Sequence, residues 1–296
     1  MISDLIGLSP KNRHIASPEQ KAVIMRIAFF GDVMGKAGRQ AVQEHLPGLR
    51  ETLNLDFVAI NAENAAGGFG ITERTANEMF DAGADALTLG NHAWDQSEAL
   101  SYIEREPRLL RPSNYPPGTA PGRGAGVFPA KNGAMVFVMN VMGRLFMDPL
   151  DDPFVSVEKE LSAAPLGEVC DAALVDFHGE ATSEKNAMGY FCDGRASLVV
   201  GTHTHIPTAD HRILPQGTAY ITDLGMTGDY DSIIGMDKEE PMRRFTTRMR
   251  SGRFSPAEGE GSLCGVVIET DERTGLSKSI HPVRIGGILH QAEPTL

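Results

Sequence analysis

Two histidines stand two residues apart in the stretch VVGTHTHIPTAD, directly after an apolar run. His203 and His205 would lie on one face of an extended chain, because side chains alternate across a strand. Imidazole nitrogens placed in this way are suited to binding metal ions. The same spacing also fits an exposed strand end without any function. The pair therefore indicates a metal site only if further ligands converge on it.

Other polar side chains also follow apolar runs, at the point where each run ends. They are Asp32, Glu63, Asn64, Asn91, His92 and His178. Ligand sites of open α/β sheets gather beyond the carboxyl ends of the strands, so we expect these residues to share one crevice. Mixed imidazole and oxygen donors suit iron, manganese or zinc. A glutamate among such groups can bridge two ions.

Each of these residues also has a structural interpretation. Asp32, Asn64 and Asn91 are residue types that satisfy turn or helix-end backbone. A histidine considered singly is more often structural than functional. Glu63 is harder to explain in this way, because a carboxylate directly after FVAINA risks burial without a partner. The joint pattern favours a site, since four of the nine histidines share this setting.

Strands and helices must alternate if these side chains are to meet. Three apolar runs, the first of them β-branched and aromatic, are each followed by a segment with helical spacing. A repeat of strand, loop and helix at about thirty residues per unit is typical of parallel βαβ units. Thr72 is predicted to cap the second helix, which ends near Gly83. The strands are RIAFFGD, DFVAINAEN and DALTLGNH, and the helices are RQAVQEHLPGLRETL, TERTANEMFDAG and SEALSYIEREPRLL.

The second half of the chain is predicted to contain a further set of strands. It follows a loop rich in proline and glycine, NYPPGTAPGRGAG, and ends with a hairpin that joins CGVVIET to HPVRI. The strands between are MVFVMNVMG, AALVDFHGE, SLVVGTHTH and TAYITDLGM, with a helix at SEKNAMGYFCDG.

Composition excludes several classes of protein. The 296 residues are 41% apolar and 22% charged, which is typical of a folded globular chain. A net charge of −12, without a run of Lys or Arg, argues against long nucleic acid as a partner. Three widely spaced cysteines without a CxxC motif indicate neither a disulfide framework nor a zinc ribbon. The longest apolar run, AMVFVMNVM, is too short to span a bilayer.

The first residues of the chain differ from the rest. Residues 1–24 lack the apolar core and cleavage site of a signal peptide. We therefore expect residues 1–24 to be an extension outside the core, residues 25–296 to be one domain, and the protein to be cytoplasmic.

Five short motifs occur in a fixed order: GDVM, NAEN, GNH, HGE and GTHTH. In this order the set resembles the calcineurin-like metallophosphoesterases, and within them the YmdB-like branch. The segments AENAAGGFGIT, LGNHAWD and DLGMTGDYDSIIGM are similar to signatures of that branch. The likeness extends from about Met25 to Gly287.

The resemblance implies a fold, a metal centre and an activity. The fold would be the four-layer α/β/β/α sandwich of metallophosphoesterases. The branch is associated with hydrolysis of phosphodiesters, notably 2′,3′-cyclic nucleotides, often with iron. By position, one metal ion would be held by Asp32, Glu63, Asn64 and His205. A second ion would be held by the bridging Glu63 together with Asn91, His178 and His203. The acid beside the scissile phosphate would be His92.

Two departures from the wider superfamily are visible. Its first motif is normally Asp-x-His, whereas Met34 stands here two residues after Asp32. Its bridging ligand is normally an aspartate, and here it is Glu63 with Asn64 beside it. Both differences agree with the YmdB-like branch.

We therefore predict a metallophosphoesterase that hydrolyses small phosphodiesters, with a hydroxide activated by two metal ions and His92 as general acid. Iron is the expected metal, with manganese or another divalent ion as the alternative. Phosphomonoesters or short oligonucleotides are alternative substrates of the same site. A non-catalytic, metal-bound regulatory or scaffold protein is a third interpretation. The resemblance is compatible with a homo-oligomer, and no membrane partner is expected.

Two glycine-rich loops have open roles. The loop GGFGIT, with Gly67, Gly68 and Gly70, is either flexible or a backbone cradle for phosphate. The loop GMTGDYDSIIGM either caps the pocket or contacts a base, and no residue roles are assigned to it.

Overall fold

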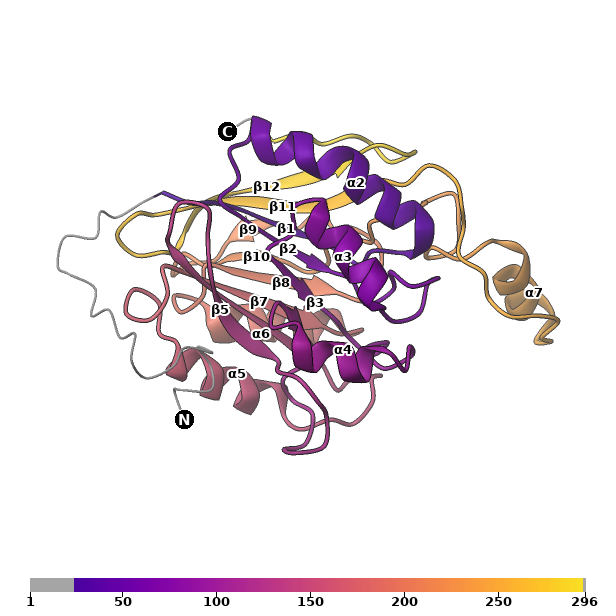
Figure 1. The fold of residues 1–296 in the computed structure, drawn as a ribbon, viewed down its shortest axis with the longest axis horizontal. Helices are drawn as coiled ribbons and strands as arrows, with labels where there is room; N and C mark the ends of the chain where they lie inside the picture. The colour runs from indigo at the N-terminus through magenta and orange to yellow at the C-terminus, as the bar shows by residue number, and fades with distance from the viewer. Residues whose placement is uncertain (1–23, 295–296) are drawn as a thin grey trace.

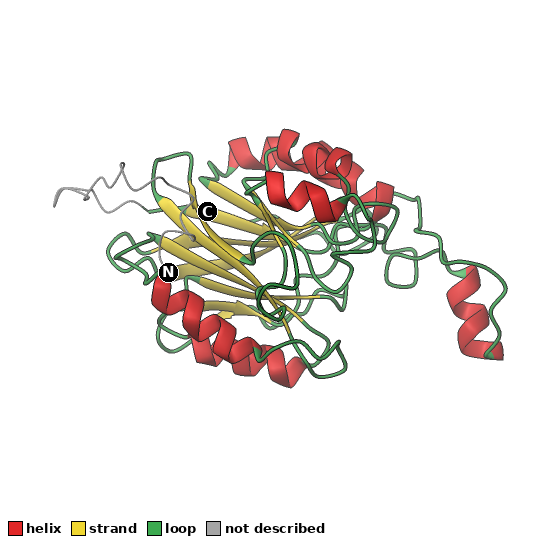
Figure 2. Ribbon diagram, turned by 60° about the horizontal axis from the view of Figure 1, so that its bottom comes forward, coloured by secondary structure: helices red, strands yellow, loops and turns green. Residues whose placement is uncertain are grey.

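Two six-stranded sheets pack face to face, and helices cover their outer faces. The structure is a computed structural model that describes residues 24–294. Figure 1 shows the two sheets stacked in the centre, and Figure 2 shows helices on either side of the strands. The predicted four-layer α/β/β/α sandwich is confirmed.

The first sheet is built mainly from the N-terminal half of the chain. The first four strands of the chain run parallel. The predicted C-terminal hairpin forms, and the structure shows that it pairs antiparallel with the first of these strands. In spatial order the strands are β12 (Ser277–Ile285), β11 (Leu263–Thr270), β1 (Arg26–Phe30), β2 (Phe57–Asn61), β3 (Ala86–Thr88) and β4 (Leu109–Leu110).

The second sheet has four parallel strands between two antiparallel edge strands. In spatial order they are β5 (Ala125–Pro129), β6 (Met135–Met142), β7 (Ala172–His178), β8 (Leu198–Thr202), β10 (Ala219–Ile221) and β9 (Arg212–Ile213). Because the parallel strands of both sheets end near the same edge of the sandwich, residues that follow them can meet there.

Each sheet has its own helices. Thr72 caps the helix that begins at Glu73, as predicted, since its hydroxyl accepts a hydrogen bond from the Thr75 amide. Helices α2 (Gly35–Thr52), α3 (Glu73–Asp81) and α4 (Ala99–Arg105) cover the first sheet, and α5 (Pro153–Ala163) and α6 (Thr182–Cys192) cover the second. Helix α7 (Glu239–Thr247) projects from the sandwich on a long loop (Figure 1).

The strands are buried on both faces, which explains their nearly continuous apolar runs. In β1, Ile27 and Phe29 pack in the layer between the sheets, whereas Ala28 and Phe30 pack under the helices. This alternation is the pleat of a strand expressed in a four-layer fold. The three cysteines are buried and unpaired, in agreement with the prediction of no disulfide framework.

One predicted helix is too long. The segment from 97 to 110 has helical spacing, but α4 ends at Arg105 and Leu109–Leu110 forms β4. Pro107 explains the difference, because a proline disfavours helical backbone at the preceding residue and lacks an amide donor. The backbone oxygen of Arg108 then pairs with the amide of Leu87 in the sheet.

Helices α5 and α7 and the edge strands β5 and β9 were not predicted from the sequence. The predicted extension at residues 1–24 lies almost wholly outside the described residues, and the single-domain assignment stays a prediction. Within the described part of the chain, every helix is too short or too polar to cross a bilayer.

Candidate metal centre

The polar residues predicted from the sequence gather where the parallel strands of both sheets end. Asp32 follows β1, Glu63 and Asn64 follow β2, and Asn91 and His92 follow β3; His178 ends β7, and His203 and His205 follow β8. Two sheets therefore contribute to one site. Neither sheet supplies the full set of donors.

His178 lies at the centre of this group and is completely buried. Its Nε2 atom is 2.9 Å from Oδ1 of Asn91, 3.1 Å from Nδ1 of His203 and 3.3 Å from Oε1 of Glu63. The ligand atoms of Glu63, His178 and His203 all lie within 4.8 Å of one another. Such a convergence of imidazole and carboxylate donors has the composition of an iron, manganese or zinc site.

Three buried oxygens support this interpretation. Oδ1 of Asp32, Oε1 of Glu63 and Oδ1 of Asn64 have no hydrogen-bond partner among the described residues. Leaving buried carboxylate oxygens unpaired is costly, and a cation bound between them would remove that cost. The donor set therefore fits a bound metal ion.

His205 points its second nitrogen at Asp32. Its Nδ1 lies 2.8 Å from the backbone oxygen of Ile234, so Nδ1 carries the hydrogen and donates it. The Nε2 lone pair is then free, 3.9 Å from Oδ2 of Asp32. A hydrogen bond that selects the tautomer in this way is typical of metal-binding histidines.

The charges of the cluster are strongly coupled. Burial lowers the pKa of His178, but the carboxylates of Glu63 and Asp32 outweigh burial and raise it to about 9. Burial, together with repulsion from His178, lowers the pKa of His203 to about 3. Burial opposes ionisation of Glu63, yet attraction to His178 holds its pKa at about 2. A bound cation would take the place of the proton on His178, because metal ligands must be deprotonated.

The backbone of the two-histidine loop is strained. His203 and His205 have φ values of 97° and 67°, in the left-handed region that residues other than glycine rarely adopt. Such conformations cost about 1–3 kcal/mol each and persist only where the surroundings impose them. In this conformation the two imidazoles face different partners, His203 facing His178 and His205 facing Asp32.

A buried carboxylate, Asp223, holds this loop in place. Its Oδ2 accepts hydrogen bonds from the amide and the hydroxyl of Thr204, at 3.1 and 2.7 Å. The same oxygen lies 2.7 Å from Nζ of Lys185, and both side chains are buried. Thr204 is the residue between the two histidines, so Asp223 restrains both of them.

A second buried carboxylate, Asp176 of β7, supports the site from within the second sheet. Asp176 accepts hydrogen bonds from Thr202, Thr88 and Asn61, at 2.7, 2.6 and 3.0 Å. The Thr202 oxygen is also 2.9 Å from Nδ1 of His178. Since the Thr202 hydroxyl donates to Asp176, it accepts from Nδ1 of His178 and leaves Nε2 directed at the site.

His92 lies at the solvent-facing edge of the candidate metal centre, with 29% of its side chain exposed. Its Nδ1 atom is 2.7 Å from Oδ2 of Asp95, and its ring lies edge-on to Phe69 at 5.4 Å. Its backbone amide donates to Glu63. The ring is therefore fixed on one side, and its Nε2 atom has no hydrogen-bond partner in the described residues.

The site opens into a cavity of about 600 Å³. Five of the predicted site residues line it, namely Glu63, Asn64, His92, His203 and His205. We call this part the metal end, and the part lined by apolar side chains of residues 233–254 the apolar end. The loop GMTGDYDSIIGM contributes Ile233, Ile234 and Met236, so it does line the pocket. Gly68 also lines it, but its amide already donates to the Asn64 backbone, which argues against a phosphate cradle at that amide.

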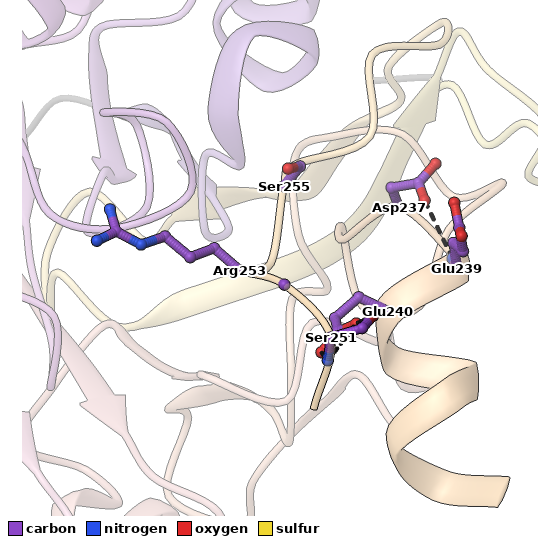
Figure 3. A pocket seen from close by; sticks show the side chains of 7 residues that line it. Asp237, Glu239, Glu240, Ser251, Arg253 and Ser255 are labelled. Carbon is purple, nitrogen blue, oxygen red and sulfur yellow. Dashed lines mark hydrogen bonds between the residues drawn. The ribbon is translucent and has the colours of Figure 1, made fainter. Parts of the chain in front are cut away.

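A second hollow of about 290 Å³ lies at the base of α7 (Figure 3). Two of its three acidic side chains already have partners: Asp237 accepts from the amide of Glu239, and Glu240 accepts from the hydroxyl of Ser251. This hollow therefore has a structural explanation and carries none of the predicted site residues.

The sequence alone did not reveal several supporting residues, namely Asp95, Asp176, Lys185 and Asp223. Asp176 had a signal, because a carboxylate within the apolar strand AALVDFH needs a partner. Lys185 had none, since it lies in an ordinary helical pattern.

Comparison with known proteins gives consistent results. The sequence model of a family described as YmdB-like protein matches residues 28–283. A Bacillus subtilis (strain 168) protein named 2′,3′-cyclic-nucleotide 2′-phosphodiesterase is 49% identical over 261 residues, which are 88% of this chain and 97% of that protein. A Mycoplasma genitalium protein named putative phosphatase/phosphodiesterase is 35% identical, over 88% of this chain and 93% of that protein.

One solved structure, described as a novel phosphatase from Mycoplasma pneumoniae, aligns with a TM-score of 0.83 at 34% identity. That alignment covers 92% of this chain and 95% of the other.

Replacing the carboxylate at the centre of the cluster should remove metal binding. Loss of a residue that only supports a metal ligand costs about 10- to 100-fold in metal affinity. We expect Glu63→Gln to weaken metal affinity by more than this, because Glu63 is itself a candidate ligand. Calorimetric titration with Mn²⁺ or Fe²⁺ measures this directly. The exposed Glu168→Gln serves as the control and should bind metal normally. A Glu63→Gln protein with full metal content and activity would contradict the assignment.

Removing the support of the two-histidine loop should weaken metal binding without unfolding the sandwich. We expect Asp223→Ala combined with Lys185→Met, which leaves no buried charge unpaired, to lower metal affinity about 10- to 100-fold. The visible spectrum of bound Co²⁺ should change as well, because the imidazoles lose their fixed directions.

The matched control is Asp193→Ala, since Asp193 is also buried and accepts amide hydrogen bonds from Gln216 and Thr218 in another loop. It should lower stability and leave the Co²⁺ spectrum unchanged. An unchanged spectrum in the double variant would show that Asp223 does not position the histidines.

Proposed function

Because the chain belongs to the YmdB-like protein family, we propose that it is a metal-dependent phosphodiesterase whose substrates are 2′,3′-cyclic nucleotides. The observation that carries this proposal is the set of unpaired buried oxygens of Asp32, Glu63 and Asn64, which meets imidazoles at one end of a cavity of about 600 Å³. The name of the Bacillus subtilis relative supports the substrate class.

The proposed centre holds two metal ions. One would be bound by Asp32, Glu63, Asn64 and His205, and the other by Glu63, Asn91, His178 and His203. Iron is the proposed metal, and manganese or another divalent ion is the alternative. Metal ions bound there would neutralise charge on the phosphate oxygens and lower the pKa of a bound water.

His92 is the proposed general acid. In a cyclic ribose phosphate the leaving group is a sugar hydroxyl, which leaves poorly until it is protonated. His92 lies on the wall of the cavity, and Asp95 holds its Nδ1 atom so that Nε2 remains available to a substrate. A proton on Nε2 can then pass to the leaving oxygen as the phosphorus–oxygen bond breaks.

Phosphomonoesters are the second candidate substrates, because one relative is named putative phosphatase/phosphodiesterase and another is described as a novel phosphatase. Long nucleic acid is disfavoured by the net charge of −12. The non-catalytic interpretation is less well supported, since a scaffold has no need for a histidine oriented at the cavity wall. The cytoplasmic location and the homo-oligomer stay predictions.

The proposed activity should appear only in the metal-loaded protein. We expect protein reconstituted with Fe²⁺ or Mn²⁺ to open 2′,3′-cyclic AMP to a nucleoside monophosphate, and Glu63→Gln to be inactive. Chromatography of the products with time measures the rate. A metal-loaded protein that cleaves p-nitrophenyl phosphate and leaves the cyclic nucleotide intact would favour the phosphomonoesterase.

The acid role of His92 can be separated from metal binding. His92→Ala should keep its metal and lose about 10²- to 10⁴-fold in turnover of 2′,3′-cyclic AMP, since that is the typical contribution of a general acid. It should lose much less on an aryl ester such as bis(p-nitrophenyl) phosphate, whose leaving group needs little protonation. Equal losses on both substrates would exclude the acid role.

A further inference from the structure

The apolar end of the cavity has no part in the phosphate chemistry described above. It is formed by Ile233, Ile234, Met236, Phe245 and Phe254. These residues come from the loop after β10, from α7 and from the segment after α7. None of these side chains can hydrogen-bond a ligand, so the end of the cavity that they form recognises apolar surface.

Much of this apolar surface is open to solvent. Phe245 is 73% exposed and Ile234 is 52% exposed. Large apolar side chains kept open beside a polar site are a feature of ligand-binding surfaces. Met242 is also exposed on α7, at 50%, but it does not line the cavity.

The arm that carries Phe245 is held in a defined shape. The Arg244 guanidinium lies 3.8 Å from the centre of the Phe254 ring. Arg244 is also paired with Glu240 at 2.7 Å, and Glu240 binds Ser251, as seen at the junction in Figure 3. These contacts join α7 to the segment that returns to the sandwich. The backbone that carries Phe245 is therefore tied to the segment that carries Phe254.

The polar and apolar ends belong to one continuous cavity. Its volume of about 600 Å³ lies within the range of about 300–1,000 Å³ that is typical of small-molecule sites. A phosphate group at the metal end fills only part of this space. The remainder of the ligand must then lie against the apolar wall, and a flat heterocycle matches that wall.

We propose that the apolar end is a nucleobase subsite and that Phe245 is its stacking residue. This inference rests on the proposed function, because the phosphate must be anchored at the metal end. The side chains of this subsite are apolar, and the backbone oxygen of Ile234 already accepts from His205, so we expect stacking rather than hydrogen bonds to the edge of a base to dominate recognition. The subsite takes purines and pyrimidines alike, with differences set by stacking strength.

The test compares nucleotides with inorganic phosphate on the metal-loaded protein. Calorimetric titration gives the affinities of adenosine 3′-monophosphate, cytidine 3′-monophosphate and inorganic phosphate. We expect Phe245→Ala to weaken binding of both nucleotides about 5- to 100-fold, the range for loss of one stacking aromatic, and to leave phosphate unchanged. Phe245→Trp should keep nucleotide binding, and Met242→Ala is the matched control on the same helix.

Each other outcome overturns the proposal. Nucleotides that bind wild-type protein no more tightly than phosphate would refute the subsite, even if cyclic nucleotides are hydrolysed. Equal weakening of nucleotides and phosphate in Phe245→Ala would assign the residue a structural role. An oligomer that dissociates in Phe245→Ala, with nucleotide affinity unchanged, would assign it to a contact between copies, and light scattering detects this.

The subsite and the proposed reaction can fail separately. Base-dependent binding that is lost in Phe245→Ala, in a protein without activity on 2′,3′-cyclic AMP, would retain the subsite and refute the reaction. In an active protein the variant should raise KM for 2′,3′-cyclic AMP and leave kcat unchanged. KM for dimethyl phosphate, a phosphodiester without a nucleobase, should not change.

Discussion

The structure depends on the meeting of two buried carboxylates, Asp32 and Glu63, at the edge where the strands of both sheets end. Burying two like charges together is unfavourable, and burial raises the pKa of Asp32 well above its usual range. The imidazole of His178 offsets part of this cost, but Oδ1 of Asp32 has no hydrogen-bond partner among the described residues. Burial of the Asp32 and Glu63 carboxylates therefore remains unfavourable, and a cation bound between them would offset this cost.

Much of the surrounding structure holds these candidate ligands in position. Asp176 fixes the tautomer of His178 through Thr202, and Asp223 restrains the strained loop of the two histidines. Each buried carboxylate accepts several hydrogen bonds from groups that would otherwise move. Donors held in this way would bind a metal ion with little reorganisation, which is the general advantage of preorganised sites.

The two ends of the cavity come from different parts of the fold. The polar end is built on strand termini in the middle of both sheets, where packing leaves little freedom. The apolar end comes from the excursion between β10 and β11 that carries α7, outside the sandwich (Figure 1). An excursion of this kind can change without disturbing the core, which is how one scaffold serves different substrates.

The sequence by itself determined the alternation of strands and helices, the sandwich and the polar residues after each strand, because these follow from local periodicity and from the order of short motifs. Tertiary structure alone decided which donors meet: the amide of His203 binds Asp32 across 171 residues of chain. The roles of Asp95, Lys185 and Asp223 and the apolar wall from α7 were equally hidden. No local pattern encodes contacts between distant segments, since they arise only when two sheets bring their strand ends together.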